Sequence, residues 1–150
     1  MADLSSTVGP LSPNIYSLTG GKLGMPKVQT GEDLASLVDK RLPATAIKAL
    51  VRNGLSDAEV YALIVPRRTL AHRIAKRQPL SKQESDKAVR VARITAMTED
   101  IFGEPERAWR WLRKPKPRFD GKTPLEMLVT EVGGRLVEEM LIQINHGMFA

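Results

Sequence analysis

The sequence predicts an all-α protein, and two observations carry this prediction. From residue 30 onward, apolar residues recur three and four positions apart, while no segment alternates polar and apolar residues as a β-strand does. Several apolar stretches are also preceded by a hydroxyl residue with an acid three positions later, a pattern that caps the free amides at a helix start. The pairs are Thr30 with Asp33, Ser56 with Glu59, Ser81 with Glu84 and Thr123 with Glu126.

Residues 1–29 precede this helical pattern and are rich in serine, threonine, glycine and proline. They contain few large apolar residues and show no helical period, so we expect a flexible arm. The remainder divides into a helical domain over residues 30–102 and a smaller helical domain over residues 103–150. A chain of 150 residues is long enough to bury a core without disulfides, and the sequence contains no cysteine.

Three short helices are expected between residues 30 and 64. The first runs from Thr30 to about Leu42, the second begins at Pro43 and ends at Asn53, and the third begins at Ser56. Apolar residues at helical spacing predict which side of each helix faces the core. They are Leu34, Leu37 and Val38 in the first helix, Ile47, Leu50 and Val51 in the second, and Val60, Leu63 and Ile64 in the third.

A basic helix follows after a short turn. Pro66 suits the first position of a helix, and Leu70, Ala71 and Ile74 are expected to face inward. Two helices joined by a short turn, the second basic on its outer side, fit a helix-turn-helix whose second helix enters the major groove of DNA. The outer residues expected to bind phosphates or base edges are Arg67, Arg68, Thr69, His72, Arg73 and Lys76.

The charge distribution around this helix favours a polyanionic partner. The chain has a formal charge of +6, and residues 67–93 contain nine cations against two acids. Such a concentration of basic charge is typical of nucleic-acid binding, and a solvated helix face is the alternative interpretation. The turn departs from many helix-turn-helix sequences at Ile64, where glycine is common, and at Pro66, where serine or threonine is common.

A long helix is expected from Ser81 to about Phe102, closed by Gly103. Its apolar residues spread around much of the helix circumference, which is typical of a central helix buried against several neighbours or a second subunit. They are Ala88, Val89, Val91, Ala92, Ile94, Met97 and Ile101.

The last third of the chain begins with both tryptophans and continues into a basic, proline-rich loop over residues 113–122. Trp109 or Trp111 is a candidate to anchor a partner, although core packing is favoured for Trp111. Thr123 is expected to begin a helix that Gly133-Gly134 breaks, and a second helix is expected to end at Gly147. Their inner residues are Leu125, Leu128, Val129 and Val132, then Leu136, Val137, Met140, Leu141 and Ile144.

The chain ends in Met148-Phe149-Ala150, two large apolar residues and a carboxylate that follow a glycine. Two interpretations are open for this tail. It is either an ordinary terminus folded back on its own helix or a plug for a pocket of a partner protein.

Residues suited to catalysis or metal binding are scarce. The two histidines, His72 and His146, are far apart in the sequence, and the acids are explained by helix capping or surface positions. We therefore expect neither enzyme activity nor a bound cofactor or metal. The sequence has no apolar run near the roughly 20 residues of a membrane span and no signal-peptide pattern at its N-terminus, so we expect a cytoplasmic protein.

From Ser56 onward the sequence resembles the Xre/MbcA/ParS-type antitoxins, which are partners of RES-domain toxins. The resemblance covers about residues 45–150. The segments that carry it include Pro66-Arg67-Arg68-Thr69-Leu70, Leu80-Ser81, Phe102-Gly103, Trp111-Leu112, Gly121-Lys122-Thr123-Pro124-Leu125, Thr130-Glu131-Val132-Gly133 and Gly147.

The resemblance implies an Xre-like helix-turn-helix domain joined by the long helix to a toxin-binding domain. It implies a RES-domain toxin that consumes NAD, either degrading it or ADP-ribosylating a target, and a C-terminal plug that enters the NAD pocket of the toxin. It further implies binding to operator DNA of its own promoter, and a homodimer within a heterotetramer or larger complex. The residues implied in toxin binding are Trp109, Gly121, Lys122, Thr123, Asn145, His146, Gly147, Met148, Phe149 and Ala150. A transcriptional regulator with a C-terminal dimerisation domain and no toxin partner is the alternative.

Overall fold

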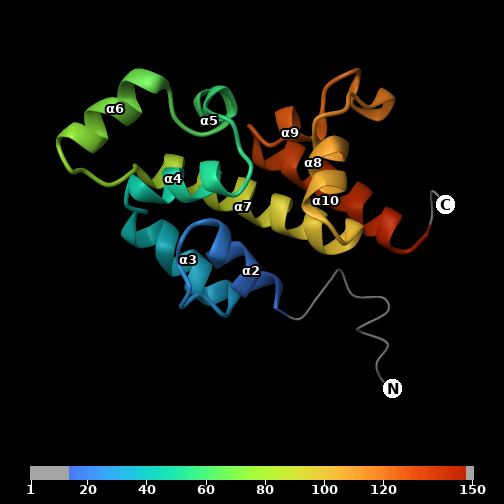
Figure 1. Ribbon diagram of the computed structural model, residues 1–150, viewed down its shortest axis with the longest axis horizontal. Coiled ribbons are helices and arrows are strands. Elements are labelled where there is room, and N and C mark those ends of the chain that lie inside the picture. The colour runs from blue at the N-terminus through green and yellow to red at the C-terminus, as the bar shows by residue number, and fades with distance from the viewer. Residues whose placement is uncertain (1–13, 148–150) are drawn as a thin grey trace.

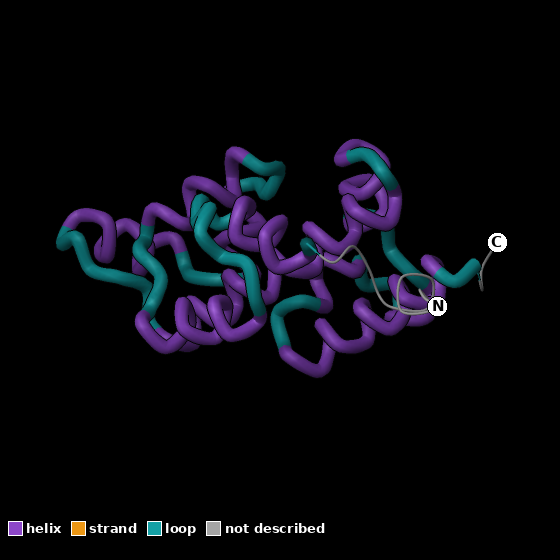
Figure 2. The backbone as a smooth tube through the Cα atoms, turned by 90° about the horizontal axis from the view of Figure 1, so that it is seen from below, coloured by secondary structure: helices purple, strands orange, loops and turns teal. Residues whose placement is uncertain are grey.

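The computed structural model describes residues 14–147, and this part of the chain is an assembly of helices joined by loops (Figures 1 and 2). The prediction of an all-α fold is therefore confirmed. The helices are α2 (Ile15–Lys22), α3 (Gly31–Lys40), α4 (Thr45–Arg52), α5 (Asp57–Leu63), α6 (Arg67–Ala75), α7 (Lys82–Phe102), α8 (Pro105–Leu112), the 3-10 turn η1 (Pro117–Phe119), α9 (Pro124–Met127) and α10 (Glu131–Asn145).

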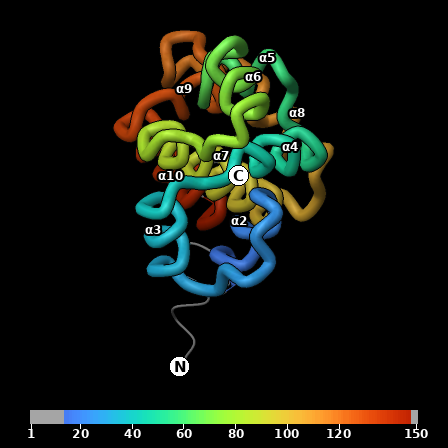
Figure 3. The backbone as a smooth tube through the Cα atoms, turned by 90° about the vertical axis from the view of Figure 1, so that its left-hand side faces the viewer, coloured from blue at the N-terminus to red at the C-terminus, as the bar shows by residue number. Residues whose placement is uncertain are grey.

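The long helix α7 is the centre of the molecule. It packs against α2, α3, α8 and α10, and Figure 3 shows these helices grouped around it. Val91, Ile94 and Met97 are fully buried along its length. The expectation of a central helix is confirmed, because apolar residues around much of the circumference allow α7 to contribute to the cores of both predicted domains.

Residues 14–29 fold onto this centre instead of forming the flexible arm that the sequence predicted. The helix α2 packs on α7, and Leu23 and Val28 after it are buried. The sequence signal was weak because the buried face of α2 uses small residues, Thr19 and Gly20, in place of large apolar ones. The prediction of an arm is therefore wrong for residues 14–29, while residues 1–13 lie outside the described part of the chain.

The predicted helix starts are present. Thr30, Ser56, Ser81 and Thr123 each accept a hydrogen bond from the amide three residues later, and the acid at that third position accepts one from the amide of the capping residue. Gly103 ends α7 in the left-handed conformation, with φ 84°. These local patterns predicted the helix starts because capping depends on residues three apart in the sequence.

The two C-terminal helices meet at a different position from the one the sequence predicted. Thr130 caps α10, so Gly133 and Gly134 lie in its first turn and do not break a helix. A Cβ on Gly133 would lie 1.9 Å from the carbonyl oxygen of Met127. The glycine is needed because α9 and α10 approach each other too closely there for any side chain.

Several apolar residues that were expected to face inward lie at the surface. Val51 of α4 and Ala71 and Ile74 of α6 are exposed, and Leu70 alone of the predicted α6 stripe is buried. In the C-terminal region the exposed apolar residues are Val129, Val132 and Leu136. Helical spacing identifies which residues share a face, but only the packing of neighbouring helices decides whether that face is covered.

Candidate functional site

The predicted helix-turn-helix is formed by α5, a three-residue turn and α6. Ile64 and Val65 of the turn are buried in the core, and neither they nor Pro66 has a positive φ. A turn without a left-handed residue does not need glycine, which explains Ile64. Pro66 is the N-cap residue of α6, with φ −60° and ψ 152°, and so precedes the first helical position at which it was expected.

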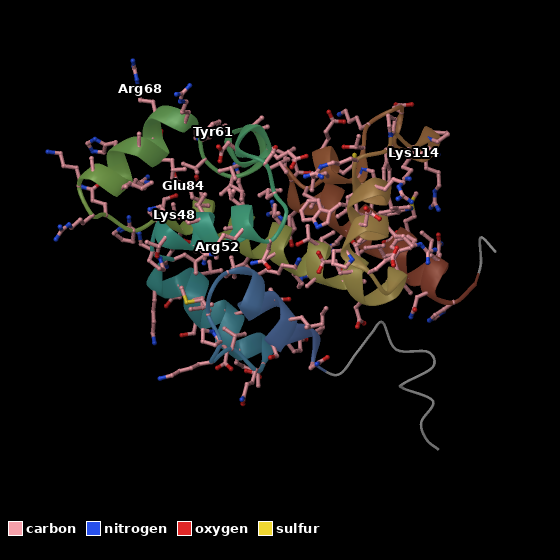
Figure 4. All side chains as sticks on the ribbon, viewed as in Figure 1. Lys48, Arg52, Tyr61, Arg68, Glu84 and Lys114 are labelled. Atoms are coloured by element: carbon pink, nitrogen blue, oxygen red, sulfur yellow. The ribbon has the colours of Figure 1, made fainter. Side chains whose placement is uncertain are left out.

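The outer side of α6 is basic. Arg67, Arg68, His72 and Lys76 are exposed, Thr69 is half-buried, and α6 contains no acid. Figure 4 shows Arg68 at the edge of the molecule, extending from α6 away from the other helices. A projecting helix with exposed cations and a partly positive N-terminus suits contact with the phosphates and base edges of DNA.

Arg73 differs from the other predicted DNA contacts because its guanidinium is held within the chain. Its Nε and Nη2 donate hydrogen bonds to the two carboxylate oxygens of Glu84, at 2.7 and 3.1 Å. Burial opposes ionisation of Glu84, but the hydrogen bonds from Arg73 and from the Ser81 amide outweigh it, and the pKa of Glu84 is lowered. Arg73 therefore joins α6 to the start of α7, and its side chain is paired with Glu84 instead of lying free on the outer side of α6 as predicted.

Trp109, predicted to contact a partner, lies in the core. Its Nε1 donates a hydrogen bond of 3.0 Å to Oε2 of Glu99, and Nζ of Lys22 forms an ion pair of 2.6 Å with the same oxygen. Its ring lies against Gly54, where an added Cβ would come within 2.6 Å of it. Trp109 thus joins α2, α7, α8 and the loop after α4, and its 9% exposure leaves little surface for a partner.

Trp111 is the more accessible of the two tryptophans, being half-buried. Its ring packs on Phe102, with centroids 5.8 Å apart, and Nζ of Lys116 lies 4.8 Å from its centroid. Burial, and then the charge of Lys114, lowers the pKa of Lys116. These contacts attach the basic loop to α8 while part of the indole stays at the surface.

The basic loop over residues 113–122 folds back on itself. Lys116 and Lys122 are joined by a backbone hydrogen bond of 3.0 Å, and the Gly121 amide donates to the carbonyl of Lys116 at 3.0 Å. Gly121 has a φ of +84°, a conformation that glycine adopts at little cost. Lys122 is exposed at the end of the loop, whereas the hydroxyl of Thr123 already accepts the Glu126 amide.

Arg113 connects the two predicted domains, and sequence reasoning did not identify this role. Its guanidinium donates to both carboxylate oxygens of Glu59 at 2.9 Å and to the carbonyl of Gly54 at 2.8 Å, and lies 4.6 Å from the ring centroid of Trp109. Burial opposes ionisation of Glu59, but hydrogen bonds from Arg113 and the Ser56 amide outweigh it, and the pKa of Glu59 is lowered. The residues are 54 positions apart, so no local pattern indicates this contact.

The C-terminal end of α10 lies far from α6 along the long axis of the molecule (Figure 1). Asn145 ends the helix, His146 is its C-cap residue, and Gly147 follows with a φ of +76°. The predicted C-terminal glycine is thus confirmed. Met148, Phe149 and Ala150 lie outside the described residues.

The predicted sites are therefore separate. The exposed residues of α6 lie at one end, and the basic loop and the end of α10 lie at the other. Among residues 14–147 there is no group of three histidines, aspartates or glutamates placed to hold a metal ion. None of the helices described is long and apolar enough to cross a membrane.

Comparison with known proteins relates each end to a protein family. Residues 33–93 match the antitoxin Xre-like helix-turn-helix domain, and residues 97–147 match the antitoxin Xre/MbcA/ParS C-terminal toxin-binding domain. An Antitoxin Xre of Pseudomonas putida is 42% identical over 125 residues, which cover 83% of this chain and 79% of that protein. The chain belongs to the Xre/MbcA/ParS antitoxins.

A second relative of this antitoxin is the Prs ADP-ribosylating antitoxin of Sphingobium sp., which is 30% identical over 129 residues covering 79% of this chain and 81% of that protein. An Antitoxin Xre of Photorhabdus laumondii is 23% identical over 129 residues, covering 84% of this chain and 86% of that protein. Family membership assigns the antitoxin a toxin partner and a DNA-binding helix-turn-helix. The match to a toxin-binding domain also favours this role over a regulator without a toxin partner.

Proposed function

We propose that this antitoxin neutralises an NAD-consuming RES-domain toxin by inserting its C-terminal tail into the NAD pocket of the toxin. The tail residues are Met148, Phe149 and Ala150. We also propose that the antitoxin, as a dimer, represses its own promoter through α6. The observation that carries the first proposal is the left-handed Gly147, at the end of a domain matched to toxin binding, directly before an apolar tail.

The chemistry of the tail suits a dinucleotide pocket. Such a pocket offers apolar slots for the adenine and nicotinamide rings and cationic or amide donors for the pyrophosphate. Phe149 and Met148 have the apolar surface for the slots, and the carboxylate of Ala150 has the charge for the donors. One relative is named an ADP-ribosylating antitoxin, and ADP-ribosylation uses NAD as the donor, which supports an NAD-consuming partner.

The size of the effect follows from apolar burial. Fully burying a side chain of the size of methionine or phenylalanine contributes about 1.5–3 kcal/mol. Because each 1.4 kcal/mol is tenfold in affinity, removing both side chains weakens the complex by about 100-fold or more. Inhibition by occlusion requires no conformational change in the toxin.

The test uses the purified toxin encoded beside this antitoxin and follows NAD consumption. The full antitoxin is expected to inhibit in competition with NAD, so that the apparent inhibition constant rises linearly with NAD concentration. A variant lacking residues 147–150 is expected to lose inhibition and to keep promoter binding. Full inhibition by the truncated variant refutes the plug, and an adjacent gene that encodes no RES-type toxin refutes the partner.

The DNA-binding proposal is supported by the exposure of Arg67, Arg68 and His72 on a helix without acids. Arg68→Ala is expected to weaken binding to the promoter and to leave the melting temperature unchanged, because the side chain extends away from the protein. Gel shifts at two salt concentrations test this, because phosphate contacts make the affinity fall steeply as salt increases. Absence of a shift at low salt with the unmodified protein refutes promoter binding.

A further inference from the structure

Three exposed aliphatic side chains form a ridge at the start of α10. Val129, Val132 and Leu136 are 42%, 70% and 42% exposed. Val129 lies in the corner before α10, and Val132 and Leu136 are one helical turn apart on the same face of the helix. We call these three residues the α10 ridge. A lone exposed leucine is ordinary, but aliphatic side chains gathered on one face are typical of a protein contact.

The position of the ridge is fixed by the corner between α9 and α10. Gly133 and Gly134 face the interior, where Gly133 touches the backbone of Met127 and Gly134 packs against the side chain of Arg90. The opposite side of the first turn, which carries Val132, is thereby directed away from the core. The ridge residues are therefore exposed because the opposite face of α10, which carries the two glycines, is tightly packed against the core.

The basic loop contacts the same face of α10 nearer the C-terminal end of the helix. Gln143 lies seven residues after Leu136 and so occupies nearly the same face of α10. Its Oε1 accepts a hydrogen bond of 2.9 Å from Nη1 of Arg118, which brings the loop against this face. The basic loop over residues 113–122 contains five cations and one acid. One face of α10 thus carries the aliphatic ridge near its start and the contact with the basic loop near its end, with the exposed Glu139 between them.

We propose that the α10 ridge is a docking surface for the toxin, separate from the tail, and that it binds an apolar patch of the toxin. The inference rests on the proposed function, because the same toxin is taken to be the partner. Two features favour the toxin as occupant: the ridge lies within residues 97–147, which match a toxin-binding domain, and it shares a helix with the end from which the tail departs.

Docking through the ridge also positions the tail near the NAD pocket. Docking through α10 fixes the position of Gly147, so the last residues search only a small volume and their effective concentration at the pocket is high. Binding and occlusion are then divided: the ridge supplies much of the affinity, and the tail supplies the block of NAD.

The experiment compares three variants for toxin binding by calorimetry and for inhibition of NAD consumption. The double variant Val132→Glu with Leu136→Glu places charge on the ridge, and both side chains are exposed enough for the fold to accept it. The matched control is Leu18→Glu on α2, an aliphatic residue that is 38% exposed. The third variant lacks residues 147–150. Circular dichroism and melting temperature verify that each variant is folded.

The ridge variant is expected to bind the toxin at least tenfold more weakly, while the Leu18→Glu control binds as the unmodified protein does. The truncated variant is expected to bind the toxin about 100-fold or more weakly, through the ridge, and not to inhibit it. If the ridge variant binds the toxin with unchanged affinity, the ridge is not a docking surface for the toxin. That result would not affect the proposal that the tail enters the NAD pocket. Self-association is measured by sedimentation. If the ridge variant loses self-association but keeps its toxin affinity, the toxin is not the partner of the ridge, and the ridge binds a second copy of the chain. Full inhibition by the truncated variant instead refutes the plug.

Discussion

The contact of Arg113 with Glu59 is expected to hold the DNA-binding and toxin-binding regions in a fixed relation. Arg113→Ala removes the paired hydrogen bonds to Glu59, the bond to the carbonyl of Gly54 and the stacking on Trp109. Glu59 keeps its hydrogen bond with the Ser56 amide, so the capping of α5 remains. The substitution therefore tests the link between the two regions with little effect on α5 itself.

The expected loss of stability follows from these contacts. Side chains at 43% and 23% exposure place the ion pair near the surface, where such a pair contributes about 0.2–1 kcal/mol. The hydrogen bond to the carbonyl of Gly54 adds about 1 kcal/mol and the stacking on Trp109 about 0.5–1 kcal/mol. We expect Arg113→Ala to lower the free energy of unfolding by about 2 kcal/mol, or the melting temperature by about 4–8 °C.

Urea denaturation measures this loss, and a double-mutant cycle isolates the ion pair. Glu59→Gln is the partner substitution because glutamine also serves in a capping box. Arg110→Ala, at an exposed arginine of α8, whose C-cap residue is Arg113, is the control and is expected to change stability by less than about 0.5 kcal/mol. A coupling energy between Arg113 and Glu59 below about 0.3 kcal/mol would show that the two groups do not interact in solution and would refute the reasoning.

Three further predictions concern single elements. Gly133→Ala is expected to lower the free energy of unfolding by about 3 kcal/mol, because its Cβ would lie 1.9 Å from the carbonyl oxygen of Met127. Gly21→Ala is the control, since an added Cβ there meets nothing within 4 Å, and it is expected to be neutral or stabilising by up to about 1 kcal/mol. Equal effects of the two substitutions in chemical denaturation would contradict this prediction. Arg73→Ala is expected to lower the free energy of unfolding by about 1–3 kcal/mol, since it leaves the half-buried Glu84 without its partner. A drop in DNA affinity at unchanged melting temperature would instead show that Arg73 contacts DNA. The lowered pKa values of Glu59 and Glu84 stabilise the fold fully above their ordinary value of 4.5, and this contribution is lost as the pH falls through the lower folded values. Denaturation midpoints between pH 7 and 3 test the last prediction, and the loss should shrink when both acids are replaced by glutamine.

Much of the candidate DNA-binding site could be predicted from the sequence. The capping pair at Ser56, the apolar stripe of α5 and the cations of α6 are local patterns, and local patterns determine helix starts and the composition of a face. The ion pair of Arg73 was not predicted because its partner, Glu84, lies on the next helix, and no local pattern indicates where the side chain points. Ile74 was also predicted incorrectly: its spacing placed it on the inner face of α6, but it is exposed because no neighbouring helix covers that side.

The C-terminal region shows more clearly where prediction from local sequence patterns fails. Glycine was interpreted as a helix breaker at Gly133, because isolated glycine costs about 1 kcal/mol in a helix. The structure uses it instead for the close contact with Met127, a requirement that arises only when two helices meet. Trp109 was placed at a partner surface for a similar reason: nothing local indicates that Glu99, Lys22 and Gly54 surround it.

By itself, the sequence determined that this protein is helical, where most helices begin, that its basic charge is concentrated after residue 66 and that it resembles an antitoxin. These properties depend on residues a few positions apart or on composition. The tertiary structure alone decided that residues 14–29 belong to the fold, that Arg73 and Trp109 are held internally, that Arg113 joins the two regions and that the ridge on α10 is exposed. Each of these depends on which helices cover which faces, and that is set by packing between residues distant in the sequence.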